Sequence, residues 1–291
     1  MQITDLSYIT KWWLIFFIIG TIFLPLTFLI FSSFFDKGYI FSKILGILFI
    51  SYIIWLLASL KIVNFSTINI FVIIVLFAIL NFFINRKYKL LINLKIYWKI
   101  FVFEEILFTI GFFFWAFIRA HEPSIHGLEK FMDFGFLNSI LRSDYFPPKD
   151  IWLTPETINY YYFGHLVTAV LIKLTGVDSM FGFNLMLALI FAFTLSCSFS
   201  IGANLYYFFE RNYKKIMITG IISSLLVTIS GNMQIIYAFF APYNTDAPIP
   251  FWSLPLTNNI TNYFYPNATR FIPRTIHEFP MYTTVVGDLH G

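Results

Sequence analysis

The segment Trp12–Phe34 reads WWLIFFIIGTIFLPLTFLIFSSF and contains no charged side chain. A helix that crosses the hydrocarbon core of a membrane needs about 20 consecutive, mostly apolar residues, so this segment predicts a transmembrane helix. Further segments of the same kind are Phe41–Leu60, Thr67–Ile84, Tyr97–Ile118, Met180–Phe209 and Ile216–Phe240. The sequence therefore predicts an all-α polytopic protein of the cell membrane.

The composition of the whole chain supports this fold class. Of its 291 residues, 58% are hydrophobic and only 12% are charged, whereas soluble domains have about 45–50% apolar and about 25% charged residues. The formal net charge is +4. Basic residues of membrane proteins gather in cytoplasmic loops, so we expect membrane lipids and no nucleic acid among the partners. Cys197 is the single cysteine and cannot form an intrachain disulfide.

Two clusters of basic residues set the predicted orientation. The loops Arg86–Lys99 and Arg211–Lys215 are both expected to be cytoplasmic. Both can face the cytoplasm only if the shorter and more polar segment Thr157–Leu174 lies at the outer interface instead of crossing the membrane. The predicted organisation is four N-terminal transmembrane helices (1–118), an external region with interfacial helices and an acidic motif (119–177), two transmembrane helices (178–240), and an external loop with the start of a further helix (241–291).

Acidic residues mark the first external region. Residues 128–142 follow a proline and a glycine and predict a helix, on which Glu129 and Asp133 are spaced i,i+4 and share a face. That face continues with Phe136 and Ile140. Carboxylates held together beside apolar surface tend to have raised pKa values unless a cation joins them. The pair is therefore a candidate catalytic site, and the alternative is an interfacial helix whose acids pair with basic residues nearby.

A run of aromatic residues follows, Asn159–His165, which reads NYYYFGH. On a helix, Tyr161 and His165 would be spaced i,i+4, and both side chains can hydrogen-bond, so they are candidates for substrate binding. The alternative is an aromatic belt at the membrane interface, where tyrosine is enriched.

Two arginines lie in the second external region, Arg270 and Arg274, against the usual depletion of cations there. On a helix they would lie one turn apart and face the same way. Arginine binds phosphate through paired hydrogen bonds, which makes these residues candidates for binding an anion. The alternative is pairing with Glu278 or Asp288. Asp288 and His290, in the motif GDLH, are further candidates for substrate binding.

A second group of acids lies within the fourth predicted span, at Glu104 and Glu105. Acids inside the membrane are costly and indicate function by default, which would suit a transporter. The alternative is snorkelling of their side chains to the cytoplasmic interface or pairing with Lys95 or Lys99, about two turns away.

Taken together, these motifs resemble those of the YYY family of archaeal and Chloroflexi-type membrane proteins, which is named for its tyrosine run. The similar blocks, within a match from about residue 25 to the last residue, are Asp36–Lys43, Trp55–Ser59, Glu105–Arg119, Glu129–Asp133, Tyr145–Pro148, Asn159–His165 and Glu278–His290. The family looks like a relative of the GT-C membrane glycosyltransferases, which implies a GT-C-like helical bundle. Members continue through many more spans, so the chain is expected to be the front part of a larger protein. More helices precede its external loop than in GT-C enzymes.

The resemblance implies the transfer of a sugar from a polyprenyl-phosphate carrier to an acceptor hydroxyl on the outer face of the membrane. Asp133 or Glu129 would be the general base, and Arg270, Arg274 and His165 would stabilise the leaving phosphate. Glu129 and Asp133 would also be the ligands of any Mg²⁺ or Mn²⁺. The alternatives are a transporter or lipid flippase, and a non-catalytic subunit of an envelope-glycan complex.

Overall fold

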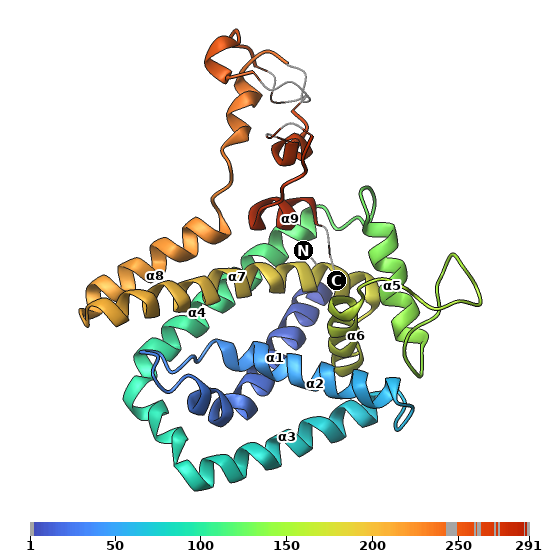
Figure 1. Ribbon diagram of the computed structural model, residues 1–291, viewed down its shortest axis with the longest axis vertical. Coiled ribbons are helices and arrows are strands. Elements are labelled where there is room, and N and C mark those ends of the chain that lie inside the picture. Colours follow the sequence, from blue (N-terminus) through green and yellow to red (C-terminus); the bar gives the residue numbers. More distant parts are fainter. Residues whose placement is uncertain are drawn as a thin grey trace.

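The chain folds into a bundle of helices, seen here in a computed structural model that describes residues 3–242, 249–258, 260, 263–270, 272, 274–287 and 289 (Figure 1). The α-helices are α1 (Ile3–Ile30), α2 (Phe41–Ser59), α3 (Thr67–Tyr88), α4 (Asn93–His121), α5 (Lys130–Arg142), α6 (Phe163–Thr175), α7 (Ser179–Phe209), α8 (Tyr213–Thr228) and α9 (Pro280–Val286). The described residues form isolated β-bridges but no β-strand. The predicted all-α fold is confirmed.

Within the described residues, five helical segments are long and apolar enough to cross a membrane. They are Asp5–Ile30, Phe41–Ser59, Thr67–Tyr88, Leu90–His121 and Ser179–Phe209. They correspond to five of the six predicted spans, so the prediction of a multi-pass membrane protein is confirmed.

The sixth predicted span, Ile216–Phe240, is α-helical only in its first part, and its last part contains the short 3-10 helix Gln234–Phe239. Helix α8 has 16 residues and ends at Thr228, which gives a length of about 24 Å against a hydrocarbon core of about 30 Å. The residues that follow Ile229 are Ser, Gly and Asn, which favour turns. Gly231 also lies against the ring of Phe279, at a position where a Cβ atom would be 2.8 Å from the ring.

The two basic clusters meet at one end of the bundle. Lys99 from the start of α4 and Arg211 from the α7–α8 turn line one cavity together with Lys37 from the α1–α2 turn. We call this the basic end. At the opposite end, which we call the site end, the α2–α3 turn contacts the segment after α5 through a 2.7 Å hydrogen bond from the Phe65 amide to the Asp144 carbonyl. A shared end is what the predicted orientation requires. Which membrane face it occupies stays a prediction.

Helix α6 is enclosed by other helices at the site end. It contacts α1, α2, α3, α5 and α7, and its residues 168–172 are buried. With 13 residues it is about 20 Å long, too short to cross the membrane alone. Where this segment lies relative to the membrane stays a prediction. The helix begins at Phe163 instead of Thr157, and it is surrounded by protein instead of lying flat with one face exposed.

Small residues allow the long helices to approach closely. Helices α7 and α8 run side by side (Figure 1). At Gly220 of α8, a Cβ atom would lie 2.7 Å from the ring of Phe199 on α7. Gly46 of α2 lies in the same way against the side chain of Ile19 on α1. In lipid, where apolar surface gains little from leaving the solvent, such contacts between small residues are a main source of helix association. Beyond α8 the chain forms an arm that extends away from the other helices, and α9 returns to pack on α7 (Figure 1).

Candidate functional site

Asp133 lies on the buried face of α5. Its side chain is 1% exposed, and Phe136 and Ile140, which follow it on the same face, are also buried. The predicted apolar setting of this acid is therefore confirmed. Glu129 differs, because α5 begins only at Lys130 and Glu129 occupies the N-cap position with an exposed side chain. The Asp133 amide donates a 3.1 Å hydrogen bond to the Glu129 carbonyl, so the two acids are one helical turn apart as predicted, but only Asp133 is buried.

Asp133 is paired with His165 of α6. The imidazole Nε2 lies 3.3 Å from the Asp133 Oδ1, and the His165 side chain is 0% exposed. The edge of Phe136 packs against the imidazole at a ring distance of 5.8 Å. Asp133 Oδ2 and His165 Nδ1 are also buried, and within the described part of the chain no group forms a hydrogen bond with either. Buried polar atoms are nearly always hydrogen-bonded, so this pair has one acceptor oxygen and one ring nitrogen available for a further group.

The tyrosine run precedes α6 instead of belonging to it. Because the helix starts at Phe163, Tyr161 is not one helical turn from His165, and the predicted i,i+4 relation is wrong. The Tyr160 hydroxyl donates a hydrogen bond of 2.6 Å to the Tyr161 hydroxyl. This bond, with further contributions from burial and from the nearby charges of Glu129 and Asp133, raises the pKa of Tyr160 to about 12.

Tyr160 is therefore a site residue that the sequence analysis missed. Its ring packs on Phe136 at 5.9 Å, and Phe136 in turn packs on His165. The Tyr160 side chain is 41% exposed. An aromatic layer thus lies between the buried pair and the surface. In the sequence, only the tyrosine run indicated this residue, and the run does not distinguish Tyr160 from Tyr161 or Tyr162.

The predicted metal ligands do not form a complete set. A Mg²⁺ or Mn²⁺ site takes several oxygen ligands. Here one acid, Glu129, is exposed and the other, Asp133, is buried against an imidazole. In the part of the chain that the structure describes, no three His, Cys, Asp or Glu side chains are grouped as a metal would need. The chemistry proposed below therefore uses only the side chains themselves.

The two arginines of the second external region do not share a helix. Arg270 is the last residue of a short 3-10 helix, Tyr265–Arg270, and Arg274 lies in a turn with a positive φ of 59°. Both side chains are exposed. The expectation that they face the same way on one helical turn is therefore wrong. Asp288 and His290 lie outside the described residues.

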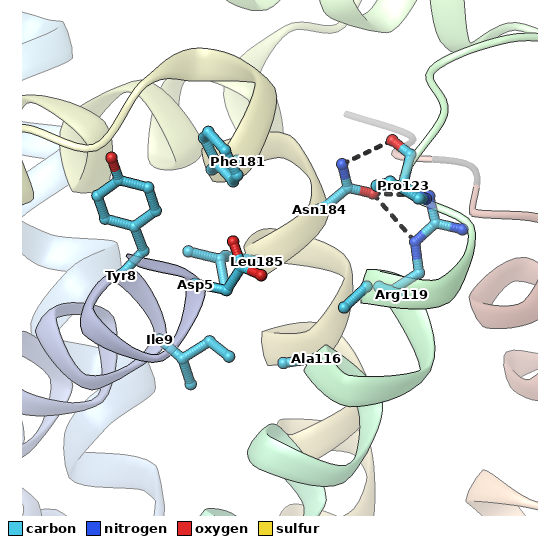
Figure 2. A pocket seen from close by; sticks show the side chains of 10 residues that line it. Asp5, Tyr8, Ile9, Ala116, Arg119, Pro123, Phe181, Asn184 and Leu185 are labelled. Carbon is cyan, nitrogen blue, oxygen red and sulfur yellow. Dashed lines mark hydrogen bonds between the residues drawn. The ribbon is translucent and has the colours of Figure 1, made fainter. Parts of the chain in front are cut away.

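A different arginine occupies a cavity at the site end, Arg119 near the end of α4 (Figure 2). It is 5% exposed, and its Nε and Nη2 donate hydrogen bonds of 3.1 and 2.6 Å to Oδ1 of Asn184 on α7. Asn184 in turn donates a 3.0 Å bond to the Pro123 carbonyl. Tyr8 and Phe181 also line the cavity. In the sequence, Arg119 is the last residue of the block Glu105–Arg119 that resembles the family, and nothing there indicates its role.

The first turns of α7 connect this cavity to the helix that carries Asp133. Ser179, at the start of α7, donates a 3.1 Å hydrogen bond to Asn138 of α5, and Asn184 lies just over one turn further along. Phe134 of α5 and Phe183 of α7 pack edge to face at 6.1 Å. Arg119 and the helix that carries Asp133 therefore both contact the first turns of α7 at the site end.

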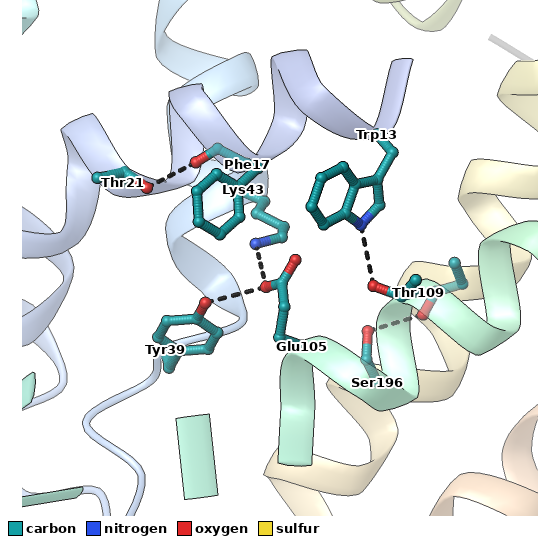
Figure 3. Close-up of polar contacts among 9 residues, drawn as sticks. Trp13, Phe17, Thr21, Tyr39, Lys43, Glu105, Thr109 and Ser196 are labelled. Atoms are coloured by element: carbon teal, nitrogen blue, oxygen red, sulfur yellow. Dashed lines mark hydrogen bonds and ion pairs between the residues drawn. The ribbon is translucent and has the colours of Figure 1, made fainter. Parts of the chain in front are cut away.

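The intramembrane acids Glu104 and Glu105 lie apart from this site. Lys43, from the first turn of α2, approaches the Glu105 carboxylate at 2.7 Å, and the Tyr39 hydroxyl donates to the same oxygen at 2.9 Å (Figure 3). The expectation of a lysine pair is confirmed for Glu105, although the partner is Lys43 instead of a lysine at the start of α4. Glu104 is fully buried.

Comparison with known proteins places these features in a family. The family described as an uncharacterised membrane protein, DUF2298, matches residues 49–291. No curated protein and no solved structure matches the chain. The matched region contains the candidate site, both acids of α4 and most of the blocks on which the resemblance was based. The chain therefore belongs to the DUF2298 family of membrane proteins.

Proposed function

We propose that the protein is a membrane glycosyltransferase that moves a sugar from a polyprenyl-phosphate carrier to an acceptor hydroxyl. One observation carries the proposal: a buried carboxylate–imidazole pair, Asp133 and His165, with an unused oxygen and an unused nitrogen. The pair lies in the region that the sequence predicts to be external. The resemblance of the surrounding blocks to GT-C relatives supports the same reaction class.

In the proposed reaction, Asp133 is the general base. Its Oδ2 takes the proton of the acceptor hydroxyl, the acceptor oxygen forms a bond to the anomeric carbon, and the bond from that carbon to the phosphate oxygen breaks. The polyprenyl phosphate leaves with the electron pair of the broken bond. His165 is a positioning residue, because its Nε2 hydrogen-bonds the other carboxylate oxygen and orients the base. A placed general base contributes about 10²–10⁴-fold to the rate.

The leaving phosphate requires positive charge instead of a proton. Arg119 is the side chain at the site end that suits this role, because a guanidinium presents paired donors to phosphate oxygens. Its cavity, with Tyr8 and Phe181, offers apolar and aromatic walls to a lipid chain. Arg270 and Arg274 are exposed on the arm and remain candidates for a first contact with the carrier.

Access to the base requires the aromatic layer to move. Asp133 and His165 are buried beneath Phe136, which Tyr160 covers in turn. Displacement of the stacked Tyr160 and Tyr161 side chains would open the Asp133–His165 pair to an acceptor. Their return would then exclude water from the pair.

The test uses the full chain in liposomes with a labelled polyprenyl-phosphate sugar. Asp133→Asn is expected to lower turnover by about 10²–10⁴-fold, and His165→Gln to lower it less while displacing the pH profile. Arg119→Lys is expected to raise KM for the carrier, because lysine keeps the positive charge but lacks the paired N–H donors of a guanidinium group. The matched control is Glu156→Gln, which neutralises an exposed acid in the loop after α5. Wild-type turnover by a folded Asp133→Asn variant would refute the proposal.

A further inference from the structure

A second group of buried polar side chains lies between the α1–α2 turn, α4 and α7. Asp36, in the turn, is 0% exposed, and its carboxylate accepts hydrogen bonds from three groups. Its Oδ1 accepts from the Gly38 amide at 2.9 Å and from the Asn204 amide group at 3.0 Å, and its Oδ2 accepts from the Ser200 hydroxyl. Hydrogen bonds of this kind stabilise a carboxylate, and the Asp36 carboxylate accepts three of them.

Glu104 of α4 faces Asp36 and has no such support. Its side chain is 0% exposed and interacts with Asp36, with the backbone at Ile40 and with Lys43. Neither of its oxygens has a hydrogen-bond donor with acceptable geometry among the described residues. The neighbouring Glu105, in contrast, forms an ion pair with the ammonium group of Lys43. Glu104 is thus a buried carboxyl group aimed at a second carboxylate, without a cation of its own.

The charges of the cluster do not balance. Asp36, Glu104 and Glu105 contribute three carboxyl groups, and Lys43 contributes one ammonium group, which Glu105 holds. Lys37, next to Asp36 in the chain, donates from its ammonium group to the Ser32 carbonyl at 2.6 Å. Among the described residues, the remaining titratable neighbours are Tyr39 on the turn and Cys197 on α7, and neither supplies positive charge. An unpaired ionised carboxylate is very costly in an apolar interior. Two carboxyl groups that share one site do not both ionise.

We propose that Asp36 and Glu104 share one exchangeable proton and form a protonatable site inside the membrane-embedded bundle. The proton resides on Glu104, which lacks donors, and is donated to Asp36, which has three. Loss of the proton places two adjacent anions at the junction of the turn, α4 and α7, so occupancy of the site controls how closely these elements pack. This inference does not depend on the glycosyltransferase proposal.

The basic end supplies a route for the proton. A cavity of about 420 Å³ opens there, and its lining includes Phe35, the residue before Asp36, together with Tyr97 and Tyr207. The cavity therefore reaches the residue that precedes Asp36 in the chain. We expect exchange with solvent from this end of the bundle.

Infrared spectroscopy of the purified full chain tests the proposal. A carboxyl group in water is ionised at neutral pH, so a C=O stretching band of a protonated carboxyl in the wild-type protein at that pH identifies a buried acid. We expect one such band, which moves on transfer to D2O and shifts when glutamate, but not aspartate, carries an isotope label at its carboxyl carbon. Absence of the band from the folded wild-type protein would overturn the proposal without any variant.

Variants of the two acids, and spectra recorded in two different salts, show where the proton resides. Glu104→Gln is expected to reduce the band to baseline. Asp36→Asn is expected to keep the band but to shift its frequency, because the proton on Glu104 loses its acceptor, and Glu129→Gln, at an exposed acid, is the matched control that leaves the band unchanged. A band that survives unchanged in a folded Glu104→Gln protein would overturn the assignment. Spectra in sodium and in choline salts separate a proton from a metal cation. We expect no difference, and loss of the band in sodium alone would replace the proton site by a sodium site.

Discussion

The buried ion pair between Lys43 and Glu105 provides a quantitative test of the packing. Lys43 is 2% exposed and Glu105 is 15% exposed, with 2.7 Å between Nζ and Oε2. The rings of Tyr39 and Phe108 surround the ammonium group at 5.3 and 5.4 Å. The lysine stem passes Gly20 of α1, where a Cβ atom would lie 2.8 Å from Lys43 Cγ. The pair thus connects three transmembrane helices.

We predict strong coupling between the two side chains. Lys43→Met leaves Glu105 as an unpaired buried anion, and Glu105→Gln leaves Lys43 as an unpaired cation. Removal of one partner from a buried pair costs about 3–5 kcal/mol in the free energy of unfolding. Replacement of both partners by neutral groups leaves no unpaired charge and is often close to neutral. The double variant should therefore be more stable than either single variant.

The assay is a double-mutant cycle on the full chain in detergent micelles, with unfolding followed by tryptophan fluorescence as a denaturing detergent is added. The sum of the single effects would be about 6–10 kcal/mol if the residues acted independently. The exposed pair Lys215–Glu210, at 2.9 Å with side chains 55% and 46% exposed, is the control, and its cycle should show little coupling. Additive losses at Lys43 and Glu105 would refute the reasoning.

Three further predictions concern orientation, helix packing and a hydrogen bond. In a cysteine-free background, Lys87→Cys should react with an impermeant thiol reagent only from the cytoplasmic side and Glu156→Cys only from outside, since both sites are exposed; labelling of both from one side would disprove the orientation. Gly220→Leu should lower the free energy of unfolding by about 1–3 kcal/mol, because a phenylalanine of α7 already fills the space, and an unchanged unfolding midpoint would contradict the close approach. Trp55→Phe removes the 3.0 Å indole bond to the Tyr162 hydroxyl and should cost about 1 kcal/mol in the same unfolding assay, with no loss in a Tyr162→Phe background.

Several features of the fold could be predicted because they depend on local physical chemistry. The cost of placing polar groups in hydrocarbon requires long apolar runs, and these runs predicted five of the spans. The predicted ends agree within one residue for α2 and α7, whereas α1 begins nine residues before the predicted Trp12. Helical periodicity placed Asp133 on an apolar face with Phe136 and Ile140, and the three side chains are buried together. Loop charge indicated that two basic clusters share a side, and both line one cavity.

The same reasoning failed where it assumed a helix that does not form. The i,i+4 relation of Tyr161 to His165 and that of Arg270 to Arg274 hold only on continuous helices, and α6 begins after Tyr161 while Arg274 lies in a turn. The end of α8 was missed because the apolar composition continues past the Ser-Gly-Asn sequence that stops the helix. Apolar content reports affinity for the membrane, whereas turn residues decide where the backbone leaves the helix.

The sequence by itself determined the class of protein, five of the membrane segments and the apolar setting of Asp133, because each of these follows from transfer free energy and from periodicity along one segment. Only the tertiary structure decided the partners. His165 reaches Asp133 across 32 positions, and Ser200 reaches Asp36 across 164. Such contacts depend on how helices pack against one another, and that packing is decided by shape at residues such as Gly46 and Gly220. A hydropathy pattern carries no information on that shape, because glycine and its larger apolar neighbours are equally compatible with a membrane span.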